Sequence, residues 1–340
     1  MSHPTTMPDP LAEMSDGLFH ELLGPKPSPG FSEDGQLERV WGAKWGARDE
    51  VGKLEVVMVR RPSRALREVA ERGESAYRPD LNAYLDPNLG WYWAGHELPD
   101  LETLDREWDG FVAALRAEGV EVVEAPELAG FTKAVFTRDP LVTVAGGAII
   151  GRMAPDMRRG EELSITQTVA AAGLPILGTI TGTGLVEGGS FVKVRPDLAF
   201  FGTSVRCNPE GHRQLATLLA EHGITVERVQ MPGYQIHLDL CCLMLDDDLA
   251  LINPRIAPYD FQTRLHELGV ETASVLPGED WGCNALVLDR RRVLFPSHLA
   301  KTAEMLSTRY DVEIVPVDYR EMNKNGGGLH CSSMELRREW

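Results

Sequence analysis

Short apolar runs separated by tight polar turns recur along most of the chain. Four times an apolar run turns at Gly, Pro or Asp residues into a second apolar run, which is the pattern of a β-hairpin. The paired runs are 141–144 with 148–151, 191–194 with 198–201, 241–245 with 249–252, and 284–288 with 292–295. The turns recur roughly every 43–51 residues, so the pattern predicts an internal structural repeat.

A helical period and a β-rich stretch follow the later hairpins. The apolar positions of the predicted helices are 215, 218 and 219; 261, 265 and 268; and 299, 303 and 306. The β-rich stretches are 224–229, 270–275 and 312–317. The N-terminal part has a related order, with strands near 54–59 and 120–125 and a helix over 101–117. The last apolar run, 329–336, has no downstream partner, and we expect it to complete the first unit.

These patterns predict an α/β protein of about five ββαβ units. Five such units pack most simply as a closed ring around a pseudo-fivefold axis within one domain. Residues 1–40 are rich in Pro, Ser, Gly and acidic residues and show no sustained period, which predicts a flexible N-terminal extension. We therefore expect a single domain over residues 41–340.

Charge and cysteine content narrow the classes of function. With 34 Lys and Arg against 51 Asp and Glu, the net charge is −17, which disfavours nucleic-acid and anionic-membrane partners and favours a small cationic ligand. The five cysteines show no CxxC spacing, so neither a disulfide framework nor a zinc site is expected. No run approaches the roughly 20 apolar residues of a membrane helix. We expect a cytoplasmic protein.

Unusual polar motifs occupy one phase of the repeat. Asp139 precedes the first hairpin, Glu187 the second, and His237-Leu-Asp239 the third. Asn284 stands at the head of the fourth, and the closing run contains His330 and Cys331 after Asn325-Gly-Gly-Gly. Equivalent positions of a pseudosymmetric ring converge on its axis, so these side chains are expected to meet in one funnel.

Each residue alone has a structural explanation. A single Cys in an apolar strand is usually a buried hydrophobe. A His-x-Asp in a strand places both side chains on one face, often as a satisfied polar pair. Asp139 before Pro140 is typical of a turn. Their occurrence at equivalent positions of successive units favours a common functional role, because residues present for local structural reasons would be scattered across the repeat.

The motifs FTRDP (136–140), EGG (187–189), HLD (237–239) and GGGLHCSS (326–333) resemble those of the guanidine-modifying enzyme superfamily. This superfamily has the pentein fold, a five-bladed α/β propeller, and includes arginine deiminases, dimethylarginine dimethylaminohydrolases, agmatine deiminases and amidinotransferases. The resemblance runs from about Val51 to Arg338.

The resemblance implies a role for each motif. Asp139 and Asp239 would hold the guanidinium through charge-assisted hydrogen bonds. Cys331 would attack its central carbon to form a covalent thiouronium intermediate. His237 would protonate the leaving amine and then activate water, oriented by Glu187. Arg158, Arg159 and Arg206 resemble residues that bind a substrate carboxylate, although for Arg158 and Arg159 a solvated basic patch is an equal alternative. Asn284 is a further candidate for substrate binding. No cofactor or metal is implied.

The motifs leave the reaction open. The stretch 52–62, with FTRDP and HLD, resembles the hydrolase branches, whereas the end, 328–338, resembles amidinotransferases and agmatine deiminases. Arginine deiminases usually carry Arg before the nucleophile, where this chain has His330, and Asp after EGG, where it has Ser190. A variant substrate is therefore expected, such as a methylated arginine or a guanidino compound of secondary metabolism.

The favoured function is a cysteine-dependent hydrolase of arginine or an arginine derivative. The alternatives are an amidinotransferase and a non-catalytic binding protein of the same fold. Whether the chain forms a homo-oligomer stays open.

Overall fold

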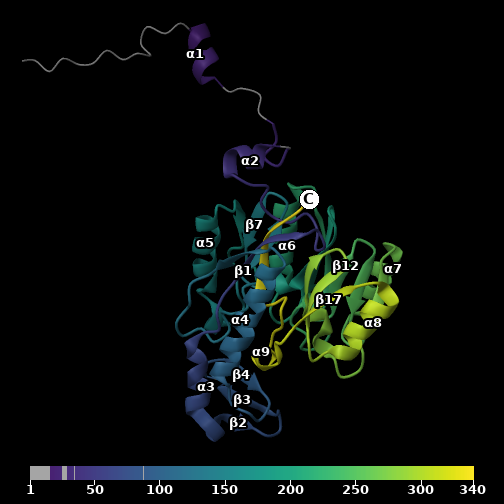
Figure 1. Cartoon of the computed structure of the whole chain (residues 1–340). Helices are drawn as coiled ribbons and strands as arrows, with labels where there is room; N and C mark the ends of the chain where they lie inside the picture. The colour runs from purple at the N-terminus through teal and green to yellow at the C-terminus, as the bar shows by residue number, and fades with distance from the viewer. Residues whose placement is uncertain (1–15, 25–28, 34, 87) are drawn as a thin grey trace, which may run out of the picture.

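The computed structural model describes residues 16–24, 29–33, 35–86 and 88–340. Five three-stranded sheets share one connectivity, in which the middle strand pairs antiparallel with one neighbour and parallel with the other. In four of them, a hairpin is followed by a helix and then by the parallel strand. This confirms the predicted α/β class and ββαβ units (Figure 1).

The strands of these sheets and the helices that connect them are as follows. The first sheet contains β18 (Ser333–Arg338), β1 (Leu54–Val59) and β5 (Glu121–Glu124), and the second β6 (Leu141–Val144), β7 (Gly147–Ile150) and β8 (Ile176–Thr179). The third contains β9 (Phe191–Arg195), β10 (Leu198–Thr203) and β11 (Thr225–Gln230), and the fourth β12 (Cys242–Asp246), β13 (Leu249–Ile252) and β14 (Glu271–Ser274). The fifth contains β15 (Leu286–Asp289), β16 (Arg292–Pro296) and β17 (Glu313–Val317). The helices are α4 (Leu101–Ala117), α5 (Glu161–Ala172), α6 (Pro209–Ala220), α7 (Tyr259–Glu267) and α8 (Ala300–Tyr310).

The first sheet joins the two ends of the domain. β18 pairs antiparallel with β1, which in turn pairs parallel with β5. The prediction that the last strand completes the first unit is therefore confirmed. The strand begins at Ser333, so His330 and Cys331 lie in the turn that precedes it and not within the strand.

Helix α4 illustrates how the sequence pattern becomes packing. Asp100 caps its N-terminus by accepting hydrogen bonds from the backbone N–H groups of residues 102 and 103. Leu104, Trp108, Phe111 and Leu115 follow helical spacing, and all four are buried. They pack into a core that also contains strand residues of β1 and β15, so the apolar stripe determines which face of α4 covers the sheets.

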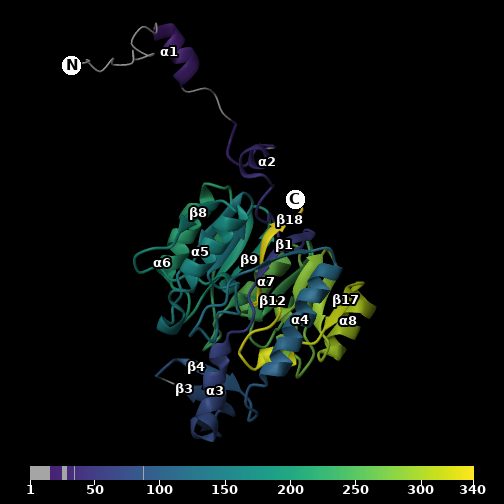
Figure 2. The ribbon, with the colours of Figure 1, turned by 60° about the vertical axis from the view of Figure 1, so that its left-hand side comes forward.

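A sixth small sheet was not predicted. It consists of β2 (Tyr77–Arg78), β3 (Ala83–Asp86) and β4 (Trp91–Ala94), and follows α3 (Arg67–Arg72) and the 3-10 helices η1 (Arg64–Leu66) and η2 (Gly73–Ala76). In both ribbon views this insertion lies at the end of the molecule opposite α2 (Figure 2). Strands of two to four residues are too short to show the alternation on which a sequence-based assignment depends.

Part of the predicted N-terminal extension can be compared with the structure. It contains α1 (Asp16–Leu23) and α2 (Gln36–Trp41), two short helices that the sequence pattern did not indicate. Residues 1–15, 25–28 and 34 lie outside the described residues, and the division at residue 40 stays a prediction. Among the described helices, none has the length and apolar character needed to cross a membrane.

Candidate active site

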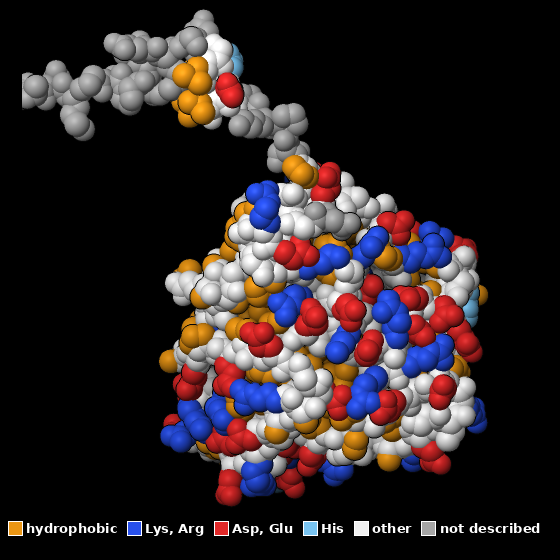
Figure 3. All heavy atoms as spheres, turned by 45° about the horizontal axis from the view of Figure 1, so that its top comes forward, with side chains coloured by type: hydrophobic (Ala, Val, Ile, Leu, Met, Phe, Trp, Pro, Cys, Tyr) orange, Lys and Arg blue, Asp and Glu red, His pale blue; other side chains and the backbone are white. Residues whose placement is uncertain are grey.

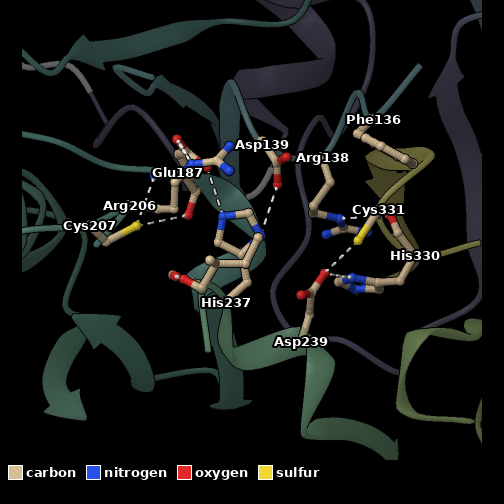
Figure 4. A network of polar contacts seen from close by, with 12 residues as sticks. Phe136, Arg138, Asp139, Glu187, Arg206, Cys207, His237, Asp239, His330 and Cys331 are labelled. Atoms are coloured by element: carbon tan, nitrogen blue, oxygen red, sulfur yellow. Dashed lines mark hydrogen bonds and ion pairs between the residues drawn. The ribbon is translucent and has the colours of Figure 1, made fainter. Parts of the chain in front are cut away.

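The polar motifs converge at the heads of the hairpins, opposite the turns. Short 3-10 helices lead into three of the hairpins: η4 (Gly188–Ser190), η5 (Leu238–Leu240) and η6 (Asp280–Asn284). Glu187 immediately precedes η4 and His237 immediately precedes η5, whereas Asp239 lies within η5. Because these residues are not in a regular strand, His237 and Asp239 do not share a strand face, and they contact different partners (Figure 4).

His237 lies between two carboxylates. Its Nε2 donates to Glu187 Oε2 over 2.8 Å, and its Nδ1 lies 3.5 Å from Asp139 Oδ1. Burial acts to lower the pKa of His237, but the charge of Asp139 and the hydrogen bond to Glu187 raise it above its ordinary value. Carboxylates at both ring nitrogens favour the imidazolium form.

Gly189 makes this approach possible. A Cβ atom at this position would lie 2.7 Å from His237 Nδ1 and 3.0 Å from Asp139 Oδ1. The second glycine of the EGG motif therefore leaves room for the imidazole beside the carboxylate.

Glu187 is fully buried and held by several donors. Its Oε1 accepts from the backbone N–H of Ala154 and from Arg206 Nε, each over 2.9 Å. Burial would raise the pKa of this carboxyl, but the His237 hydrogen bond and the Arg206 charge lower it to about 2. Glu187 is therefore a fixed negative charge.

Cys331 lies on the other side of the site, beside Asp239. The thiol donates to Asp239 Oδ2 over 3.6 Å, and the same oxygen accepts from His330 Nδ1 over 2.8 Å. Burial and then the charges of Asp239 and Asp139 raise the pKa of Cys331 well above its ordinary value. Without a cation bound nearby, Cys331 is a thiol. The pKa of Asp239 is lowered: burial opposes ionisation, but the hydrogen bond from His330 favours it.

Asn284 holds the turn that carries Cys331. Its Oδ1 accepts from the backbone N–H of Gly328 over 2.9 Å and from that of Cys331 over 3.2 Å. A Cβ at Gly328 would lie 2.7 Å from this oxygen, so the glycine permits the contact. Asn284 does not line the cavity described next, and its contacts indicate a positioning residue.

A cavity of about 80 Å³ lies among these groups. Its charged or reactive lining residues are Lys133, Asp139, Arg158, Arg206, His237 and Cys331. Tyr92 from β4 and Asn325 also line it. Tyr92 and Lys133 were not predicted as site residues, because neither belongs to a hairpin-head motif. Asn325, in contrast, belongs to the glycine-rich run that precedes Cys331.

The three predicted arginines are placed differently. Arg158 is buried, with Nη1 2.5 Å from Asp139 Oδ2 and Nη2 2.8 Å from Glu161 Oε2. Arg206 lines the cavity and contacts Glu187. The side chain of Arg159, in contrast, is 40% exposed, with Nε 3.6 Å from Asp156 Oδ1, and is not brought to the cavity. Arg158 and Arg159 are consecutive residues at the end of η3 (Asp156–Arg158), where one turns inward and the next outward.

One group of side chains could hold a metal ion. Asp139, Glu187 and His237 each offer a ligand atom, and these atoms lie within 4.8 Å of one another. Both carboxylates already form ion pairs with arginines, Asp139 with Arg158 and Glu187 with Arg206. A divalent ion would have to compete with two buried guanidinium groups, so the donor set fits a metal poorly.

Relatives in sequence include dimethylarginine dimethylaminohydrolases and arginine deiminases. A family model described as N,N dimethylarginine dimethylhydrolase, eukaryotic, matches residues 100–338. The N(G),N(G)-dimethylarginine dimethylaminohydrolase of Pseudomonas aeruginosa is 27% identical over 238 residues, which cover 70% of this chain and 90% of that protein. An arginine deiminase of Rhodococcus erythropolis is 27% identical over 180 residues, 50% of this chain and 44% of the deiminase.

Solved structures show the same fold. The Pseudomonas aeruginosa dimethylarginine dimethylaminohydrolase, as a mutant complexed with citrulline, aligns with a TM-score of 0.67 at 24% identity, covering 83% of this chain and 99% of that one. An amidinotransferase of saxitoxin biosynthesis from Microseira wollei aligns with a TM-score of 0.69 at 17% identity, covering 87% and 98%. The family match extends from the residue that caps α4 to the last residue of β18. The chain therefore belongs to the N,N-dimethylarginine dimethylhydrolase family and is a guanidine-modifying enzyme of the pentein superfamily.

Proposed function

We propose that this chain hydrolyses the guanidinium group of arginine or an arginine derivative, with Cys331 as the nucleophile. One observation carries the proposal. Within the described residues, Asp139 and Asp239 each keep one buried carboxylate oxygen, Oδ1, without a hydrogen-bond partner. Both charges act on the Cys331 thiol. Buried carboxylate oxygens without a hydrogen bond are costly, so they favour a ligand that donates hydrogen bonds and carries positive charge. Asp139 Oδ1 lies 3.5 Å from His237 Nδ1, whereas Asp239 Oδ1 has no such neighbour among the described residues.

A guanidinium meets this requirement. It is a planar cation whose N–H donors match carboxylates with high geometric specificity. Binding it would also change the state of Cys331. Since the two aspartates raise the pKa of the thiol, a cation that neutralises them lowers that pKa again. The substrate would then help to form the thiolate that attacks it.

The reaction follows from these positions. The Cys331 thiolate forms an S–C bond to the central guanidinium carbon, and the tetrahedral adduct expels one amine, which takes a proton from the His237 imidazolium. The product of this half is a thiouronium on Cys331. Neutral His237 then removes a proton from water as the water attacks the same carbon. The C–S bond breaks, which returns the thiolate and releases a urea-type product such as citrulline.

Other residues act through these groups. Glu187 keeps His237 oriented and charged. Asn284 positions the Cys331 turn, and Arg206 supplies a cation at the cavity wall. These roles are part of the proposal.

We also infer that the five units close into a ring around this site. Contacts between β18 and β6, between β9 and β12, and between β1 and β15 support closure. Such a ring would bring hairpin heads from every unit toward one axis.

Product analysis tests the proposal. The protein is incubated with arginine, methylarginines and agmatine, with and without glycine or lysine as acceptor, and products are identified by mass spectrometry. Citrulline with ammonia or a methylamine supports hydrolysis. Ornithine with a new guanidino acid would instead identify an amidinotransferase. Trapping of an adduct on Cys331 by intact-mass measurement supports the covalent step, and undiminished turnover in Cys331→Ala would overturn it.

A further inference from the structure

Positive charge dominates the wall of the cavity. Three cationic side chains line it, namely Lys133, Arg158 and Arg206, and Asp139 is the one carboxylate in the lining. In the proposed function, Asp139 is a partner of the substrate guanidinium. The remaining lining therefore offers no carboxylate for a second cationic group on the substrate.

Lys133 is the unusual member of this set. It is only 6% exposed, and its Nζ donates to three oxygens: the Tyr92 carbonyl over 2.9 Å, the Asn325 carbonyl over 2.6 Å and Asn325 Oδ1 over 2.9 Å. Three acceptors require three N–H donors, which only the ammonium form provides. The ammonium also lies 3.9 Å from the centre of the Tyr92 ring, a cation–π contact.

No carboxylate among the described residues forms an ion pair with Lys133. Burial and the nearby charges of Arg158 and Arg206 lower the pKa of Lys133 well below its usual range. Arg158 is paired with Asp139 and Glu161, and Arg206 with Glu187, so the positive charge in excess is that of Lys133 itself. An anionic ligand group would relieve that excess, whereas an ammonium group would add to it.

Arg206 has capacity for such an anion. Its Nε and Nη2 are directed to Glu187, and Nη1 has no hydrogen-bond partner among the residues that the structure describes. Lys133, in contrast, already uses its three donors within the protein. Arg206 would therefore contact the anionic group directly, and Lys133 would act through its charge.

We propose that the substrate is a compact guanidino acid, with an anionic group at the end away from the guanidinium and no ammonium group beside it. The cavity of about 80 Å³ is small, which favours a substrate with a short chain. This inference rests on the proposed hydrolysis at Cys331 and names the class of substrate for that site. Lys133 is the residue that selects against an α-amino group.

Three compounds separate the charges of the tail. 5-Guanidinopentanoate carries only the carboxylate, arginine differs from it by the α-ammonium, and agmatine carries an ammonium and no carboxylate. We expect kcat/KM to fall at least about tenfold at each step in that order, equivalent to about 1.4 kcal/mol per step. Dissociation constants measured by calorimetry with Cys331→Ser are expected to follow the same order without depending on turnover.

Variants locate the selection at Lys133. Lys133→Met keeps the length of the side chain and removes its charge. The ratio of kcat/KM for 5-guanidinopentanoate to kcat/KM for arginine should therefore fall toward unity. Asn325→Asp keeps the lysine and supplies a carboxylate beside it, so it should lower the same kcat/KM ratio. Lys301→Met, at an exposed lysine of α8 outside the cavity, is the matched control and should leave the preference unchanged. A ratio of two substrates does not depend on the folded fraction of each variant.

The outcomes separate this inference from the proposed function. Equal or tighter binding of arginine, or no binding of 5-guanidinopentanoate, would overturn the inference. Citrulline formation through a Cys331 adduct would in that case still support the proposed function. Selective binding of 5-guanidinopentanoate with no turnover of any of the compounds would support the inference and contradict the hydrolysis.

Discussion

The two ends of the hairpins both carry many charges, but only one end buries them. At the turns, a cavity of about 810 Å³ is lined by residues of both signs: Arg48, Asp49, Lys53, Arg195, Asp247, Asp289, Arg290 and Glu339. Arg290 Nε lies 2.9 Å from Asp247 Oδ2, with side chains 44% and 64% exposed. Basic and acidic side chains are similarly interleaved over the face turned forward in Figure 3.

At the hairpin heads the cavity is about one tenth as large, yet Asp139 in its lining and Asp239 beside Cys331 are both buried. Each keeps an oxygen without a hydrogen-bond partner among the described residues. Water can solvate the charges at the turns, so these charges do not need a bound ligand to stabilise them. The carboxylates at the heads are buried, where charge is solvated less well than at the surface, so a matching cation stabilises them. Burial of incompletely paired charge, and not cavity size, distinguishes the candidate active site.

Removal of the Cys331 thiol at the head end is expected to have the largest effect on activity. Cys331→Ala should lower kcat/KM by at least about 1,000-fold, since the proposed covalent intermediate forms on this thiol. The measurement is product formation by mass spectrometry, with thermal unfolding to confirm the fold. Cys242→Ala in β12, where burial raises the pKa of the thiol to about 12, is the matched control and should keep most of its activity. Equal losses in both variants would contradict a special role for Cys331.

An aspartate at each end provides the next comparison. Asp239→Asn keeps shape but removes a buried charge, and should lower kcat/KM about 100-fold or more through weaker guanidinium binding. It should also lower the pKa of Cys331, because Asp239 raises it. Rates of thiol alkylation against pH would report that shift. Asp247→Asn, at an exposed position of the turn end, should change neither quantity.

Two glutamates with similarly lowered pKa values test burial directly. The pKa of Glu187 is about 2, and that of the half-buried Glu210 is also lowered to about 2, by its hydrogen bonds with Arg213 and Gln214. A carboxyl whose folded-state pKa is lowered stabilises the fold above its ordinary pKa of 4.5, and loses that contribution as the pH falls toward the folded value. Glu187→Gln should flatten the loss of stability between pH 4.5 and 2, measured by urea unfolding. Glu210→Gln should flatten it much less, because solvent screens the surface ion pair of Glu210 with Arg213.

The same Glu187→Gln variant should affect catalysis. Loss of the carboxylate lowers the pKa of His237, which Glu187 helps to raise. Since His237 acts in its protonated form in the proposed mechanism, the basic limb of the kcat profile should move to lower pH. We expect kcat to fall by about 10- to 100-fold near neutral pH. An unshifted basic limb would exclude His237 as the titrating acid.

The smallest effect is expected at the turn end. Arg290→Gln removes the ion pairs of Arg290 with Asp247, which is 64% exposed, and with the less exposed Asp49. The free energy of unfolding should change by less than about 1 kcal/mol, and activity should not change. A large loss of activity would show that the turn end and the head end of the hairpins are coupled, which would contradict a functional difference between them.

Sequence patterns were most informative where a strong period or a repeated position was present. The bounds of α4 agree with the prediction, since its apolar positions form a continuous stripe. Helix α5 was not predicted, because its buried residues, Glu161, Ile165 and Val169, form only a narrow line that includes a charged residue. The insertion with β2, β3 and β4 was missed because its strands are too short.

The site residues were predictable as a set, but their contacts were not. The repeat placed Asp139, Glu187, His237, Asp239 and Cys331 in one phase, and the structure brings them together. It did not reveal that Arg158 turns inward while Arg159 faces solvent. Neighbours in sequence reach different environments through backbone direction, which is determined by packing.

The sequence by itself determined the ββαβ repeat, the closing role of the last strand and the set of candidate site residues, because local periods and repeated motifs are encoded in consecutive residues. Only the tertiary structure decided which carboxylate oxygens lack partners and how Asn284 holds the Cys331 turn. It also placed Tyr92 and Lys133, 41 positions apart in the chain, side by side at the cavity wall. These features depend on contacts between separate units, which exist only once the chain has folded.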